Sequence, residues 1–471
     1  MAKDQLAWLR EGKVLSGREQ LFCILRLSIP AILAQISTVA MEYIDASMVG
    51  HLGAEASASI GLVSSTTWLI GGITCSIATG FTVQVAHRIG AGQDGEARNV
   101  TKHGLMTVLT FSFFMAVLSA ILSFSLPAWL GGAAEIQQNA TRYFLIYSLA
   151  LPFMALNYAA GGMIQCSGNM RLPSMINICM CVLDVIFNSL LIFPTRIVTL
   201  GTIRLIIPGA GLQVAGAALG TALSEVTCAG LMLYFLLIRS EKLHLRKEHV
   251  HSSYYLELKR ALQISLPIAV ENAINGGAQV VSTRIVAPLG NISIAANSFS
   301  VTAEGLCYMP GYGISSAATA LIGQSIGAKR DDLTKRLSWM TVGLGMLIMS
   351  GMGVLLYIFA PQMLMILSPD REIQVLGASV LRIEAFAEPF FAASIVAAGV
   401  LRGAGKTFLS TLMNLSTMWL VRLPLAAFLA PKIGLHGVWI AMALQLTVCG
   451  TLFLLTLWRE TKTNRLTSKM L

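Results

Sequence analysis

The chain has 471 residues, of which 55% are hydrophobic and only 12% are charged, and its mean hydropathy is +0.70. This composition excludes an ordinary soluble domain, in which about a quarter of the residues are charged. The net charge of +10 does not require a nucleic-acid partner, because the short cytoplasmic loops of membrane proteins collect Lys and Arg. We therefore expect an integral membrane protein that binds no nucleic acid.

Twelve apolar stretches follow one another along the chain, each long enough to cross a hydrocarbon core about 30 Å thick. Runs this long and continuously apolar indicate helices, because only helices and closed barrels satisfy their backbone groups in lipid. The predicted fold class is an all-α integral membrane protein with twelve transmembrane helices. The predicted spans lie near residues 23–49, 58–83, 104–126, 143–164, 172–194, 212–238, 262–287, 296–322, 338–360, 376–400, 408–430 and 434–458.

The charges of the connecting segments predict how the chain is oriented. With the N-terminus in the cytoplasm, the cytoplasmic loops and tails hold about 25 Lys and Arg residues, against about five outside. The first 22 residues show no cleavable signal. We expect a multi-pass protein of the cell inner membrane with both termini in the cytoplasm. Its predicted parts are an N-terminal segment, an N-lobe (spans one to six), a cytoplasmic linker, a C-lobe (spans seven to twelve) and a tail, at 1–22, 23–238, 239–260, 261–458 and 459–471.

The second half of the chain repeats the first at a constant offset. Gly53 in HLG corresponds to Gly290 in PLG, and at the same offset Gly168 corresponds to Gly405. The register breaks only after span five, where the first half is about 16 residues longer. Six spans per half is an even number, so the two six-helix bundles are related by an axis along the membrane normal. This symmetry predicts a cavity between the bundles and alternating access by rocking of one bundle against the other.

Several strings resemble the multidrug and toxic compound extrusion (MATE) transporters. In MEYIDASMVGHLG, an Asp stands shortly before G-x-L-G, as it does in that family's first span. Supporting strings are VLDVIFNSLLIFP in span five, VAGAALGTALSE in span six, GQSIGAKRD after span eight and PFFAASIVAAGVLRGAGKT through span ten. The resemblance covers roughly residues 15 to 460. It implies a secondary antiporter, not an enzyme, that exports amphipathic, often cationic, compounds against an H⁺ or Na⁺ gradient and needs no cofactor besides that ion.

Ionisable side chains inside a membrane are costly and are therefore functional candidates. Span one carries Asp45 three residues after Glu42, and span five carries Asp184 four residues before Asn188, on one helical face. The family's N-lobe cation site combines an Asp in span one, an Asn and an Asp in span five, and a Thr in span six. Asp45 and Thr221 match it, whereas Asp184 and Asn188 stand in exchanged order. We expect these four residues to couple transport by sharing a proton or by holding Na⁺, with Asp45 and Asp184 as metal ligands. The alternative is a buried polar network that only locks helices together.

The second half has its own intramembrane acids, and Glu271, Glu304 and Glu388 are candidates for a substrate or secondary cation site. The family's span-seven Glu corresponds here to Asn275, one turn beyond Glu271. Glu388 directly precedes a proline, where a kink can aim its carboxylate into the cavity. The alternative is that these acids pair with the intramembrane arginines Arg284, Arg382 and Arg422.

Three other classes of protein compete with an exporter. A lipid-linked oligosaccharide flippase needs a cation-rich cavity, whereas the intramembrane acids here outnumber the three arginines. Another polytopic carrier of the major-facilitator type carries a basic G-x-x-x-D-R-x-G string, which the loops here lack. A membrane enzyme usually needs a His, Cys or metal cluster at the membrane surface, and the eight cysteines form no CxxC pair. We therefore predict a monomer in the lipid bilayer that exports a small cationic substrate.

Overall fold

The computed structural model describes residues 6, 8, 16–200, 203–245, 253–368, 370–463 and 466. Parts of the predicted N-terminal segment, linker and tail lie outside these residues. The helices of the first half are α2 (Gly17–Gly50), α3 (Ala54–Gly90), α4 (Asp94–Leu122), α5 (Leu126–Trp129), α6 (Ala134–Cys166), α7 (Arg171–Leu191) and α8 (Gln213–Tyr234), which continues as the π-helix η1 (Phe235–Arg239). The second half has α9 (Tyr254–Val286), the short η2 (Ala287–Leu289), α10 (Asn291–Gly327), α11 (Asp331–Leu367), α12 (Arg371–Glu384), α13 (Glu388–Gly403), α14 (Thr407–Thr417), η3 (Met418–Arg422), α15 (Leu423–Ile433) and α16 (Leu435–Lys462).

The helices account for the twelve predicted spans. Among the described residues, nine helical segments are long and apolar enough to cross a membrane, and the bent pair of α12 and α13 makes a tenth. The remaining two spans are α9 and α10, which have 33 and 37 residues. They follow α2 and α3 at the offset of the sequence repeat, so they hold the positions that the repeat assigns to spans seven and eight.

Glycines fix equivalent helix ends in the two halves. Gly53 and Gly290 precede α3 and α10 with φ of 115° and 93°. Gly168 and Gly405 follow α6 and α13 with φ of 98° and 71°. These backbone conformations strain any residue with a Cβ atom, so glycine is required where each helix begins or ends. The repeat seen in the sequence is therefore a repeat of helix boundaries.

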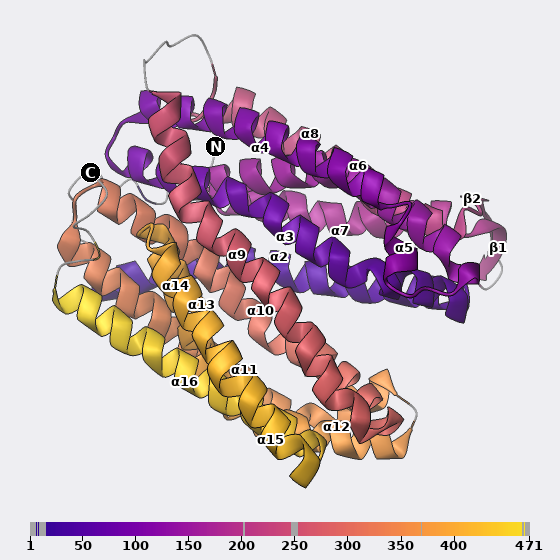
Figure 1. Cartoon of the computed structure of the whole chain (residues 1–471). Coiled ribbons are helices and arrows are strands. Elements are labelled where there is room, and N and C mark those ends of the chain that lie inside the picture. The colour runs from indigo at the N-terminus through magenta and orange to yellow at the C-terminus, as the bar shows by residue number, and fades with distance from the viewer. Residues whose placement is uncertain are drawn as a thin grey trace.

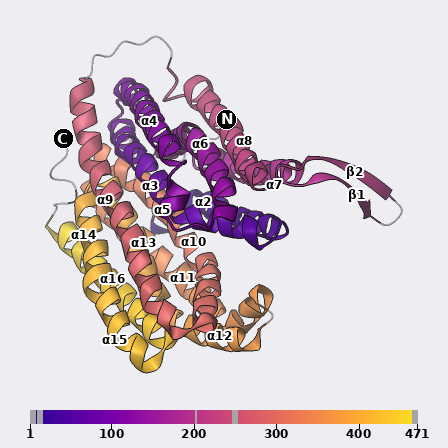
Figure 2. The same cartoon turned by 45° about the vertical axis from the view of Figure 1, so that its right-hand side comes forward.

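The two halves form two helical bundles that meet at one end. Figures 1 and 2 show α2 to α8 in one bundle and α9 to α16 in the other, close together at the end that holds the start of α2 and the end of α16 and further apart at the other end. The lobes meet where α2 packs on α10 and where α3 packs on α9 and α10. The largest buried cluster spans this junction, because Ile24 and Leu27 of α2 lie in it with Ile314 and Leu321 of α10. One end of the molecule is thus a packed apolar seal between the lobes.

Two features differ from the regular spans that the sequence predicts. The insertion after span five forms a hairpin of two antiparallel strands, β1 (Pro194–Leu200) and β2 (Ile203–Ala210), where we expected only a loop. The many β-branched residues of this segment favour strands. Span ten is broken between α12 and α13, which meet at an angle of 60°. Pro389 stands in the first turn of α13, where a missing N–H costs nothing, so the proline starts a helix rather than bending one.

Candidate cation-coupling site

The four residues predicted for the N-lobe site come together where α2, α7 and α8 pack. Asn188 Nδ2 donates to Asp45 Oδ1 at 2.8 Å and to Asp184 Oδ2 at 2.9 Å. Thr221 on α8 lies close to Asp184. Asp184 and Asn188 are fully buried. The exchanged order in span five therefore preserves the cluster, because both residues lie on the same face of α7.

The geometry of the cluster suits a proton or a hard cation. The carboxyl groups of Asp45 and Asp184 lie close to each other and share Asn188 as a hydrogen-bond donor, an arrangement that suits uptake of one proton. Asn188 Oδ1 is buried with no hydrogen-bond partner among the described residues. Carboxylate, amide and hydroxyl oxygens are the ligands that hard cations prefer. No three described His, Cys, Asp or Glu side chains are placed to hold one metal ion, so the site offers a cation only two carboxylates.

Helix α8 contributes two site residues that the sequence did not single out. A Cβ atom at Gly220 would overlap the amide oxygen of Asn188, so only glycine lets α8 lie against that side chain. Ser224 Oγ, one turn further on, donates to Asp184 Oδ1 at 3.3 Å. The signal was present as small residues four apart, Gly216, Gly220 and Ser224, a spacing that marks close helix packing in membranes.

A second polar pair bridges α6 and α8 in the same lobe. Asn157 Nδ2 donates to Glu225 Oε2 at 3.0 Å, and the amide of Asn157 is largely buried. Glu225 follows Thr221 by one helical turn, so it lies beside the predicted cluster. The sequence contained this acid in the string VAGAALGTALSE, but nothing in that string assigned it a partner.

The structure separates the acids of the C-lobe into two groups, of which Glu271 is one. Thr411 Oγ1 donates to Glu271 Oε2 and Asn414 Nδ2 donates to Glu271 Oε1, both at 2.7 Å. Asn275 is half-buried one turn further along α9. Glu271 is therefore held on both oxygens by α14, and it stands apart from the other two candidates.

The second group lies where span ten breaks, between α12 and α13. Glu304 is 6% exposed, and Glu388 is fully buried beside it together with Glu384. The carboxyl groups of Glu304 and Glu384 lie close to each other, and Arg422 is the cation that faces both. Both carboxyl oxygens of Glu384 are buried with no hydrogen-bond partner among the described residues. Glu384 was missing from the predicted set because no motif distinguishes it from the other acid in its helix.

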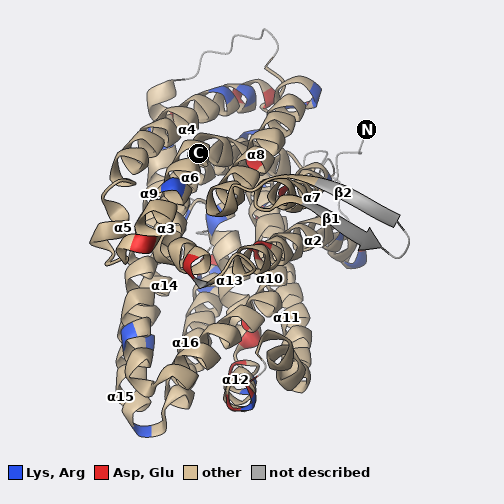
Figure 3. Ribbon diagram, turned by 90° about the vertical axis from the view of Figure 1, so that its right-hand side faces the viewer, with Lys and Arg blue, Asp and Glu red and all other residues tan. Residues whose placement is uncertain are grey.

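The other two arginines do not join these acids in the contacts described. Arg382 Nε donates to the carbonyl of Tyr357 at 3.3 Å. The side chain of Arg284 is exposed. Figure 3 marks the acidic positions within the bundles in red.

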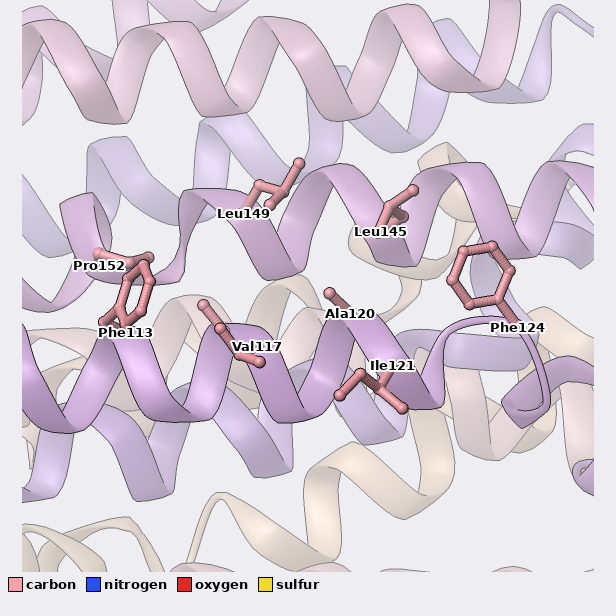
Figure 4. Close-up of a pocket in the computed structure, with 9 residues that line it drawn as sticks. Phe113, Val117, Ala120, Ile121, Phe124, Leu145, Leu149 and Pro152 are labelled. Atoms are coloured by element: carbon pink, nitrogen blue, oxygen red, sulfur yellow. The ribbon is translucent and has the colours of Figure 1, made fainter.

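A separate apolar groove lies between α4 and α6 and contains none of these residues. Figure 4 shows its lining, which includes Phe113, Val117, Ile121, Leu149 and Phe124, and it encloses about 290 Å³. These five side chains are all exposed. An exposed groove without polar side chains suits lipid chains rather than a charged cargo.

Comparison with known proteins places the chain in a family. The model of the MatE family matches twice, over residues 30–190 and 267–428, and the two matches begin at equivalent positions of the repeat. The chain is similar to a probable multidrug resistance protein NorM of Thermotoga maritima, with 24% identity over 92% of this chain and 91% of that protein. It is also similar to a protein named FAD transporter of Shewanella oneidensis, with 22% identity over 91% of this chain and 92% of that protein.

Solved structures agree with the fold. The crystal structure titled MATE in complex with MaL6 covers 99% of this chain and 100% of its own, with a TM-score of 0.88 and 20% identity. The predicted resemblance is thereby confirmed. The chain belongs to the MatE family and is a multi-pass membrane transporter, not an enzyme.

Proposed function

We propose that this transporter exports amphipathic organic cations in exchange for H⁺ or Na⁺ and that the Asp45, Asn188 and Asp184 cluster is its coupling site. The observation that carries the proposal is the double hydrogen bond of Asn188, which holds two carboxyl groups together inside a lobe. Two carboxylates this close repel each other when both are charged, so the arrangement favours uptake of one proton or cation.

The energy available to such a site is sufficient for export. Exchange of one monovalent organic cation for one H⁺ or Na⁺ moves no net charge, so the concentration gradient of the ion drives it and the membrane potential does not. A tenfold ion gradient supplies about 1.4 kcal/mol, which sustains a tenfold concentration ratio of the cargo. A second ion taken up per cycle would add its charge, at about 2.3 kcal/mol per 100 mV. The H⁺ and Na⁺ alternatives share this arithmetic.

The position of Asp45 connects the site to the lobe interface. Asp45 lies on α2, the helix that also packs on α10 of the C-lobe. Two residues before it, Tyr43 lies close to Thr302 of α10. Binding or release of a cation at the cluster changes the charge on α2, a helix of the N-lobe that also contacts the C-lobe. This contact gives a physical route from cation binding to rocking of the lobes.

The C-lobe acids support a cationic cargo. Glu304, Glu384 and Glu388 are three buried carboxyl groups against one facing arginine, Arg422. In addition, we propose that the chain works as a monomer with its termini and the 239–260 linker in the cytoplasm. The charge count of the loops supports that orientation.

Transport by purified protein in proteoliposomes tests the proposed function. We expect an imposed pH or Na⁺ gradient to drive uptake or release of a fluorescent organic cation, and one of the two gradients to suffice. An anionic dye of similar size serves as the control cargo. Movement of the anion alone, or of lipid-linked sugars alone, would replace the cation exporter with another polytopic carrier or a flippase.

A further inference from the structure

At the packed end, two side chains at equivalent positions of the sequence repeat hydrogen-bond from one lobe to the other. His87 lies in the last turn of α3, and its Nε2 donates to the carbonyl of Gly403 at 2.8 Å. Gln324 lies in the last turn of α10, and its Nε2 donates to the carbonyl of Cys166 at 2.6 Å. The two donors are equivalent in the sequence repeat, and so are the two acceptors. Each lobe thus donates one side-chain hydrogen bond to a backbone carbonyl of the other, and the two bonds are related by the pseudo-symmetry of the repeat.

The acceptors are carbonyl groups that their own helices cannot satisfy. Cys166 is the last residue of α6 and Gly403 is the last residue of α13. Carbonyl groups in the final turn of a helix lack an intrahelical donor. Cys166 is only 4% exposed and Gln324 is fully buried, so breaking these bonds leaves polar groups without water. Separating the lobes at this end is therefore unfavourable unless water enters and hydrogen-bonds these groups.

Glycines let the ends of α3 and α10 approach closely enough for the two donors to reach their acceptors. A Cβ atom at Gly90 would overlap the backbone of Gln324, and a Cβ atom at Gly327 would overlap the backbone of His87. Gly323 lies against Ala86, and a Cβ atom added to it would be 2.6 Å from that of Ala86. Residues 86 and 323 are themselves equivalent in the repeat, so this contact marks the pseudo-twofold axis between the lobes.

We propose that His87 and Gln324 are the two halves of a latch that holds the lobes closed at this end, and that both bonds break when the transporter opens there. The proposal rests on the proposed alternating access. It assigns positioning roles to two residues distant from the coupling carboxylates. It also explains why His87 at the end of α3 and Gln324 at the end of α10 can stand at equivalent positions of the repeat. Each side chain carries an N–H group at a similar distance from its backbone.

Cys166 is a built-in reporter of the latch. Its thiol is buried with Ala86 and Ala320, between the lobes. Cys228 is fully buried in the N-lobe and serves as an internal control. We would measure alkylation of both thiols by N-ethylmaleimide, resolved by peptide mass spectrometry, in intact protein in lipid nanodiscs. Both ends of the molecule are accessible there, so the result does not depend on topology.

The test compares side chains that differ in reach. Asparagine is one methylene shorter than glutamine, so His87→Asn and Gln324→Asn remove the bonds but keep an amide, whereas His87→Gln keeps the reach. We expect each Asn variant to label Cys166 about fivefold faster and the double variant about 25-fold faster, if the bonds act independently. We expect His87→Gln to stay within about twofold of the parent protein, and Cys228 labelling to be unchanged in all variants.

Equal Cys166 labelling in the parent protein and the double Asn variant would overturn the latch. So would faster labelling in His87→Gln that matches His87→Asn. The double swap His87→Gln with Gln324→His keeps both donors and should behave as the parent protein. Because labelling needs no cargo, a chain that opens as expected but moves no organic cation would overturn the proposed function and leave the latch in place.

Discussion

At the scale of single residues, we expect Gly220 to matter to the proposed coupling site because it lies against Asn188. Gly220→Ala places a methyl group on the amide oxygen of Asn188 and should push that side chain away from both carboxylates. We expect gradient-driven export to fall by at least about tenfold while the protein still inserts, because a small misplacement within a site is costly to function. Export in proteoliposomes, with protein quantified in the same vesicles, measures this effect.

Gly230→Ala is the matched control for Gly220→Ala. It lies on the same helix, and an added Cβ meets nothing within 4 Å. Alanine favours a helix over glycine by up to about 1 kcal/mol, so this variant should export normally and be at least as stable. Equal losses in both variants would show that α8 tolerates no change, and Gly220 would then have no special role.

Arg422 should matter for stability more than an exposed intramembrane arginine. It faces Glu304 and Glu384, which are buried. Removing one partner of a buried charged group is strongly destabilising, by about 3–5 kcal/mol in measured cases. We expect Arg422→Leu to lower the melting temperature of the purified protein by several degrees and Arg284→Leu to leave it nearly unchanged. Similar melting temperatures for both variants would contradict the charge balance inferred for this cluster.

The acids of the N-lobe site were found from their charge, whereas Gly220 and Ser224 of α8 carry none. Asp45 and Asp184 stood out because carboxylates are rare in apolar spans. Gly220 and Ser224 are common in such spans, and their role depends on how α8 is rotated against α7. The latch residues of α3 and α10 stand at helix ends, where a solvated polar residue is the ordinary expectation. Only the crossing of these two helices turns them inward.

At the scale of elements, the repeat predicted more than the hydropathy pattern did. Helices α3 and α10 begin and end at equivalent positions of the repeat, and both extend beyond the apolar stretches at 58–83 and 296–322 that predict them. The hairpin of β1 and β2 was not predicted, because the repeat offers no second copy for comparison. The break in span ten lies beside the proline where the sequence predicts a kink, but its form, an interruption between two helices, was not predicted, since a proline marks a helix start and a helix kink equally well.

The hairpin should be dispensable for coupling. In the C-lobe the equivalent helices α15 and α16 are joined by Gly434 alone, so the fold does not need a long connection there. We expect a chain in which residues 195–209 are replaced by a short Gly-Ser linker to insert normally and to export within about twofold of the parent protein, because long and short loops differ little in closure entropy. Loss of export with an intact melting temperature would instead assign the hairpin a role in transport.

At the scale of the whole molecule, the orientation that we propose rests on the loop charges. We expect a water-soluble maleimide added outside intact cells to leave a cysteine placed at Ser240 unlabelled and to label one placed at Gly131, which lies between α5 and α6. Inside-out vesicles should give the opposite pattern. Efficient labelling of the linker from outside would invert the topology and the direction of transport that we propose.

The central claim is that the N-lobe carboxylates convert an ion gradient into export. Asp45→Asn keeps the size and the hydrogen-bonding capacity of the side chain, but it removes the charge that must alternate between loaded and empty. Glu42→Gln neutralises a neighbour on the same helix and is the control. The decisive measurement is export of an organic cation from proteoliposomes with and without an imposed ion gradient. We predict that Asp45→Asn loses the gradient-dependent part of export and that Glu42→Gln retains it. Export at the parental rate by well-folded Asp45→Asn protein under the imposed gradient would contradict this role and move coupling to the acids of the C-lobe.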